Sequence, residues 1–168
     1  MEADRSVRPS DLLKHALESR HPEQRAAILA WKLLAQFLRL CQHHGECKAD
    51  KFKAYTLCVF ALAVVDQARD FHQPSPDSAV GYYLLAIWDK FQTFDFKSTS
   101  VILDADGITK MRDKLPEACP VDIWIRDTRS NSSNNVSNKF LKTCREKLTH
   151  IRVDQLRTHS DLRWQTNV

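Results

Sequence analysis

The apolar positions of the chain are densest near its middle, where nine apolar residues follow one another from Leu57 to Val65. A segment that is apolar on every face is either surrounded by the rest of a protein or inserted in a membrane. A membrane-spanning helix needs about 20 such residues, so we interpret this run as part of a buried core. Helical spacing continues outward through four more apolar residues, Phe52, Tyr55, Ala68 and Phe71. The pattern predicts a central helix over residues 49–71, around which the rest of the fold is organised.

Amphipathic helices are predicted on both sides of the central one. A short helix over 11–20 precedes a longer one from Pro22 to about His44, where Gly45 provides a stop. The apolar face of the longer helix comprises residues at intervals of three and four: Ala27, Ala30, Trp31, Leu34, Phe37, Leu38 and Cys41. After Pro74, a fourth helix begins at Pro76. Its predicted buried face comprises Val80, Leu84, Ile87, Trp88, Phe91 and Phe94.

The pattern changes after Phe96. Residues 100–103 and 121–125 are short apolar runs typical of strands, and they predict a small two-stranded β element. Between them, a turn at Asp106-Gly107 is followed by a predicted short helix over 108–115. The predicted fold class is mainly α: a single-domain bundle of about five helices with this small β element before the last helix.

A polar segment separates this part of the chain from the last helix. Residues 128–138 are almost wholly polar and rich in Ser and Asn, which is typical of a surface loop or linker. The predicted organisation is a helical core with its β element over 1–127, the linker over 128–138, and a C-terminal amphipathic, basic helix and tail over 139–168. The apolar stripe of that helix comprises Leu141, Cys144, Leu148 and Ile151.

The excess positive charge of the chain lies in this last helix. The formal net charge is +4; residues 1–138 carry 18 basic and 18 acidic side chains, whereas residues 139–168 carry seven basic and three acidic ones. The candidate binding residues are Lys139, Lys142, Arg145 and Arg152. We expect them to contact another protein or, as the alternative, the phosphates of RNA or DNA. The modest size of the excess argues against a dedicated nucleic-acid-binding protein.

Cysteine usage bears on the compartment. The chain has five cysteines, an odd number, and its first residues are charged rather than apolar. No secretion signal or membrane-spanning segment is evident in this pattern. We therefore expect reduced thiols in a cytoplasmic or nuclear protein that has no membrane partner.

A cluster of cysteine and histidine residues is the candidate metal site. Cys41, His43, His44 and Cys47 offer thiolates and imidazoles, which are the ligands that zinc prefers. Their spacing matches none of the common zinc patterns, and Cys41 falls on the apolar face of its predicted helix. We interpret Cys41 as a buried thiol and expect no metal or other cofactor, with these residues kept as weak candidates.

One motif resembles an enzyme active site. The segment 102–109 is similar to the nucleophile motif of haloacid-dehalogenase-type phosphotransferases, in which a strand ends in Asp-x-Asp. The resemblance implies that Asp104 attacks phosphorus, that Asp106 handles the proton, and that magnesium neutralises the charge.

The surroundings of this motif favour a simpler interpretation. About sixty residues follow the motif, and they show no alternation of strands and helices. The same letters also open a calcium-binding loop, but Leu115 stands where that loop needs a glutamate. We therefore interpret Asp104–Gly107 as an Asp-Gly turn and expect the protein not to be an enzyme.

The function expected from the sequence is that of a non-enzymatic helical adaptor or regulatory module. Such a module binds another protein through an exposed helix face or groove. The last helix is the candidate surface, because the polar linker would let it dock or release.

Overall fold

The computed structural model describes residues 9–41, 51–71, 75–96, 98–104, 106–113, 122–123, 125–127, 134–135 and 137–165. These residues contain five helices: α1 (Pro9–Glu18), α2 (Pro22–Phe37), α3 (Ala54–Phe71), α4 (Pro76–Thr93) and α5 (Asn138–Gln165). They also contain five short strands: β1 (Thr99–Leu103), β2 (Thr109–Asp113), β3 (Asp122–Ile123), β4 (Ile125–Asp127) and β5 (Asn134–Asn135). The predicted fold class is confirmed, because the described chain is mainly helical and a small antiparallel sheet of β3 and β5 precedes the last helix.

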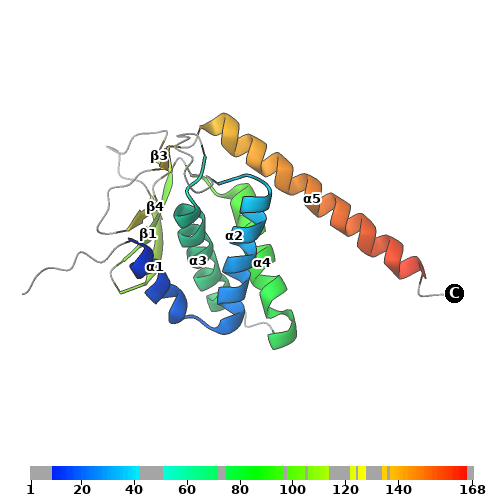
Figure 1. Ribbon diagram of the computed structural model, residues 1–168, viewed down its shortest axis with the longest axis horizontal. Helices are drawn as coiled ribbons and strands as arrows, with labels where there is room; N and C mark the ends of the chain where they lie inside the picture. Colours follow the sequence, from blue (N-terminus) through cyan, green and yellow to red (C-terminus); the bar gives the residue numbers. More distant parts are fainter. Residues whose placement is uncertain are drawn as a thin grey trace, which may run out of the picture.

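Helix α3 is the centre of the fold. It lies between α2 and α4 on one side and the sheet that contains β1 on the other (Figure 1). From Leu57 to Val65, no side chain is more than 6% exposed. Because this part of α3 is covered on both sides, it has no solvated face, and its sequence shows an unbroken apolar run rather than an amphipathic period. Exposed side chains of α3 occur after it, at Gln67, Arg69 and Asp70. The predicted central helix is confirmed over Ala54–Phe71; it is wrong over residues 51–53, which are not helical, and residues 49–50 lie outside the described residues.

Aromatic rings fill the space where α3, α4 and the start of the sheet meet. Phe60 of α3 lies 5.8 Å from Phe91, 5.2 Å from Phe94 and 5.4 Å from Phe96, measured between ring centroids. Trp31 of α2 joins the cluster at 5.4 Å from Phe91. Tilted and edge-on ring pairs at these distances add to the stabilisation from burial.

Helix α2 ends earlier than the sequence predicts. The prediction of a helix to about His44 is wrong over residues 38–41, and residues 42–50 lie outside the described part. Arg39 has a φ of 56°, and the N–H groups of Arg39 and Leu40 donate to the carbonyls of Gln36 and Ala35. This pair of hydrogen bonds around a left-handed residue is a Schellman ending, which glycine most often supplies. Here the left-handed residue is an arginine, so no glycine in the sequence marks the end of the helix.

The sheet beside α3 has three strands in the order β2-β1-β4. β1 pairs antiparallel with β2, with Val101 opposite Met111, and parallel with β4, with Val101 opposite Ile125. The strand predicted over 100–103 is confirmed within β1. The helix predicted over 108–115 is wrong where it is described, because Thr109–Asp113 forms β2. The segment is too short to hold a helix alone, whereas β1 supplies a partner for its backbone hydrogen bonds.

The strand predicted over 121–125 contributes to two sheets. Asp122–Ile123 forms β3 and pairs with β5, while Ile125 begins β4 beside β1. β5 consists of Asn134–Asn135, which belong to the polar segment that the sequence analysis interpreted as a loop. Most of that segment lies outside the described residues.

A polar cluster fastens α1, α3 and the β1–β2 turn to one another. Arg20, which follows α1, donates from Nε and Nη2 to the two carboxylate oxygens of Asp66 on α3, at 2.7 and 2.8 Å. Thr109 Oγ1 donates to Asp66 Oδ2 at 2.7 Å, and Arg20 Nη2 also donates to the carbonyl of Gly107 at 2.9 Å. The bidentate pair raises the pKa of Arg20, chiefly through its hydrogen bonds to Asp66. Such two-point pairing fixes geometry as well as charge. We call these residues the Arg20–Asp66 clasp.

Candidate interaction surfaces

Helix α5 joins the bundle through its first half. Leu141, Cys144 and Leu148 are buried and Ile151 is half-buried, so most of the predicted apolar stripe of this helix is covered by the rest of the chain. A helix of 28 residues is about 42 Å long. Its C-terminal half projects beyond the bundle (Figure 1).

The four basic residues predicted on α5 have different surroundings. Lys139 and Lys142 are exposed, and Lys142 Nζ lies 4.0 Å from Glu146 Oε1. Arg145 is half-buried and makes hydrogen bonds within the protein. The side chain of Arg152 lies outside the described part. The structure therefore does not bring the four together into one described basic patch.

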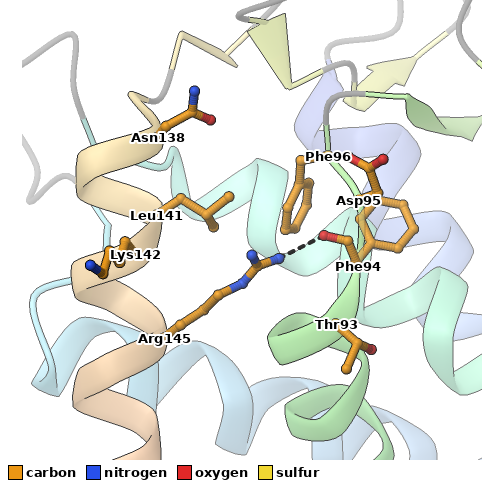
Figure 2. A pocket seen from close by; sticks show the side chains of 8 residues that line it. All are labelled: Thr93, Phe94, Asp95, Phe96, Asn138, Leu141, Lys142 and Arg145. Atoms are coloured by element: carbon orange, nitrogen blue, oxygen red, sulfur yellow. Dashed lines mark hydrogen bonds between the residues drawn. The ribbon is translucent and has the colours of Figure 1, made fainter.

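Arg145 attaches α5 to the end of α4. Its Nε donates to the carbonyl of Phe91 at 3.2 Å, and its Nη2 donates to the carbonyl of Phe94 at 2.6 Å, the bond drawn in Figure 2. Burial lowers the pKa of Arg145, while nearby Asp95 opposes this effect. A cation that caps the final carbonyls of a helix also interacts favourably with the helix dipole. Gln92 Nε2 returns a hydrogen bond to the carbonyl of Arg145 at 3.1 Å.

A cleft of about 420 Å³ lies beside this attachment, between the end of α4 and the start of α5. Figure 2 shows Arg145 and Leu141 reaching into it from α5, with Phe94 and Phe96 on the opposite wall. The guanidinium that would recognise an anionic ligand is already bonded to two backbone carbonyls. We therefore interpret the cleft as the joint between two helices.

The metal candidates are described only in part. Cys41 is buried and pairs through its backbone with Phe52 in an isolated bridge, whereas His43, His44 and Cys47 lie outside the described residues. Within the described part of the chain, no three His, Cys, Asp or Glu residues are grouped to hold a metal ion. Burial raises the pKa of Cys41.

Two further cysteines are buried free thiols. Burial raises the pKa of Cys58 to about 11 and that of Cys144 to about 12. A thiol attacks or binds metal as the thiolate, and burial disfavours that form for both side chains.

Asp104 holds the turn between β1 and β2. Its Oδ1 accepts hydrogen bonds from the N–H of Asp106 at 3.0 Å and of Ile108 at 2.9 Å, and its Oδ2 lies 3.4 Å from Lys110 Nζ. Gly107 has a φ of 76°, which suits glycine, and its N–H donates to the carbonyl of Asp104 at 3.1 Å. The geometry is that of the predicted Asp-Gly turn, in which the side chain of Asp104 binds backbone amides.

Helix α2 carries an exposed apolar row that was not predicted from the sequence. Leu29, Leu33 and Phe37, spaced four residues apart, are 52%, 65% and 81% exposed. Together with exposed Ala26 they form what we call the α2 row. Placing Phe37 in the core was therefore wrong. The buried face of α2 is instead formed by Gln24, Ala27, Ile28, Trp31 and Ala35.

The error has an identifiable source. Helix α2 carries apolar residues on two opposite faces, and the predicted apolar face combined members of both. Residues that are four and eight positions apart share a helix face, so the spacing of Leu29, Leu33 and Phe37 already separates them from Trp31 and Ala35. That spacing is the signal by which the row could have been found.

Two cations and an apolar groove lie beside the α2 row. Arg25 and Lys32 are half-buried on the adjacent side of α2, seven residues apart. They also line a groove of about 340 Å³ between α1, α2 and the start of α3, whose apolar walls include Leu13, Leu17 and Cys58. The two cations therefore stand between two apolar surfaces.

Comparison with known proteins gives no relative for the chain: no family, no curated protein and no solved structure matches it. In the part of the chain that the structure describes, every helix is too short or too polar to cross a membrane.

Proposed function

We propose that the protein is a non-enzymatic helical interaction module that binds another protein on the α2 row. The observation that carries the proposal is the exposure of Leu29, Leu33 and Phe37 on one helix face. Large apolar side chains gathered on an exposed face are typical of interaction sites, since covering them removes apolar surface from water. An amphipathic partner helix packs on such a face through apolar residues at intervals of three and four.

Helix α5, which the sequence suggested as the docking surface, has less support in that role. Its apolar stripe is buried against the bundle, and Arg145 fastens it to α4. Release of α5 would expose Leu141 and Leu148 and break these hydrogen bonds, whereas the α2 row is exposed without any rearrangement.

Nucleic-acid binding, the alternative, is also less supported. The guanidinium of Arg145 is engaged with the carbonyls of Phe91 and Phe94, which leaves Lys139 and Lys142 as the exposed cations among the described candidates. Two phosphate contacts give weak binding that salt readily abolishes.

A reducing compartment, the cytoplasm or the nucleus, is part of the proposal. Cys41, Cys58 and Cys144 are buried free thiols, which fits a chain that functions where thiols stay reduced.

Site-specific photo-crosslinking tests the proposed function. A photoreactive amino acid replaces exposed Ala26 in the full chain, which is expressed in its native cells. We expect a discrete protein adduct that disappears when Leu33→Gln and Phe37→Gln are added, because the partner loses its apolar contacts. These exposed substitutions should change the stability by no more than about 0.5 kcal/mol each.

The matched control places the same photoreactive residue at Lys139 of α5, which is also exposed. An adduct formed only from position 139 would move the docking surface to α5. An adduct at position 26 that survives both glutamine substitutions would show that the α2 row is not the contact.

A further inference from the structure

Part of the α2 row has the spacing of paired helices: Ala26, Leu29 and Leu33 fit successive a, d and a positions of a seven-residue repeat, while Phe37 falls at the flanking e position and Gln36 at the next d. If Ala26 and Leu33 occupy the a positions and Leu29 the intervening d position, then Arg25 and Lys32 both fall at g. Positions g and e flank the apolar seam when two helices pair, and the charges there determine which partner is accepted. Two g residues on neighbouring heptads lie about 10.5 Å apart along the helix.

The surroundings of these cations strengthen their attraction for a carboxylate. Arg25 and Lys32 are half-buried between the α2 row and the apolar groove beside α1. A docked partner would exclude more water from them, and the attraction between opposite charges increases as the effective dielectric constant falls. Within the described residues, neither cation makes an ion pair, so a carboxylate from a partner would not have to displace any carboxylate of those residues.

A second copy of the chain is a poor occupant of this surface. In an antiparallel pair of α2 helices, g faces g, so the Arg25 and Lys32 edge of one copy would face the same cationic edge of the other. In a parallel pair, g faces e, where α2 carries Glu23, Ala30 and Phe37. Of these three residues, Glu23 lies before Arg25 in the helix, and Ala30 and Phe37 carry no charge that could pair with Arg25 or Lys32. The charge pattern thus favours a different chain.

We propose that the segment docked on the α2 row is an amphipathic helix with acidic residues at seven-residue spacing along one edge of its apolar stripe. The inference rests on the proposed function and specifies the chemistry of the partner. The apolar stripe covers Leu29, Leu33 and Phe37, and the acidic edge pairs with Arg25 and Lys32.

A designed peptide tests the inference with the full-length protein. The probe is a three-heptad helix with leucine at a and d and glutamate at e and g, labelled for fluorescence anisotropy. Its matched control carries lysine in place of every glutamate. We expect the acidic peptide to bind at least about tenfold more tightly than the basic one, and the preference to shrink as salt is raised.

Two charge-reversed variants locate the effect. Arg25→Glu with Lys32→Glu should abolish the preference for the acidic peptide, while Lys139→Glu with Lys142→Glu, which changes the net charge equally, should alter it less than about twofold. Equal sensitivity of the two variants would reduce the preference to overall charge and overturn the inference.

The peptide and crosslinking results separate the two proposals. A crosslinked partner at position 26, with no preference for the acidic peptide, would contradict the proposed acidic edge of the partner but not the proposed docking surface. Absence of both the preference and the adduct would remove the proposed function together with the inference.

Discussion

Replacing Phe60 by alanine should lower the free energy of unfolding by about 3–5 kcal/mol. Phe60 is fully buried on the central helix and contacts the rings of Phe91, Phe94 and Phe96. The truncation removes apolar contact and leaves a cavity that three rigid rings cannot fill by collapse. Urea unfolding followed by circular dichroism measures the change as a shift in midpoint at constant slope.

Phe37 supplies a matched control for Phe60. It has the same side chain, but it is 81% exposed on α2. Phe37→Ala should change the free energy of unfolding by no more than about 0.5 kcal/mol. Equal losses from Phe60→Ala and Phe37→Ala would contradict both the buried centre and the exposed row.

Breaking the Arg20–Asp66 clasp should be the other large effect. We expect Arg20→Met to lower the free energy of unfolding by about 2–3 kcal/mol, because it leaves the carboxylate of Asp66 largely buried with Thr109 as its remaining partner within the clasp. The value is lower than for a fully buried pair, since part of Asp66 reaches solvent. The double variant Arg20→Met with Asp66→Leu removes the stranded charge and should recover part of the loss.

An exposed ion pair provides the comparison for the clasp. Lys142 and Glu146 are four residues apart on α5, with their side chains 80% and 57% exposed. Lys142→Met should cost no more than about 0.5 kcal/mol, because water screens such a pair. If Arg20→Met costs as little as Lys142→Met, the clasp does not hold α1 and the turn to α3.

The central helix was predictable because a nine-residue apolar run has few interpretations in a chain of this composition. The end of α2 was not, since Arg39 adopts the left-handed conformation that sequence reasoning assigns to Gly45. The strand β2 was not predictable either. Its residues form a strand because β1 offers partners for their backbone hydrogen bonds, and the local pattern of residues 109–113 does not show this pairing.

The candidate surfaces were likewise predictable only in part. Sequence reasoning found the basic residues of α5, but the backbone carbonyls that bind Arg145 come from a segment about fifty positions earlier. It placed Phe37 in the core because hydrophobic residues at helical spacing usually are buried there. Which of the two apolar faces of α2 turns inward depends on the positions of α3 and α4, and that is decided by the tertiary packing.

Hydrogen exchange of the native protein tests the central position of α3 most directly. If α3 is enclosed by α2, α4 and the sheet, its amides from Leu57 to Val65 exchange only when the whole protein unfolds. Their exchange should then report the same free energy as urea unfolding, and amides of the first turn of α1 should exchange much faster. Exchange of the α3 amides through openings well below the global free energy would contradict an enclosed central helix, and with it the packing that turns the α2 row toward solvent.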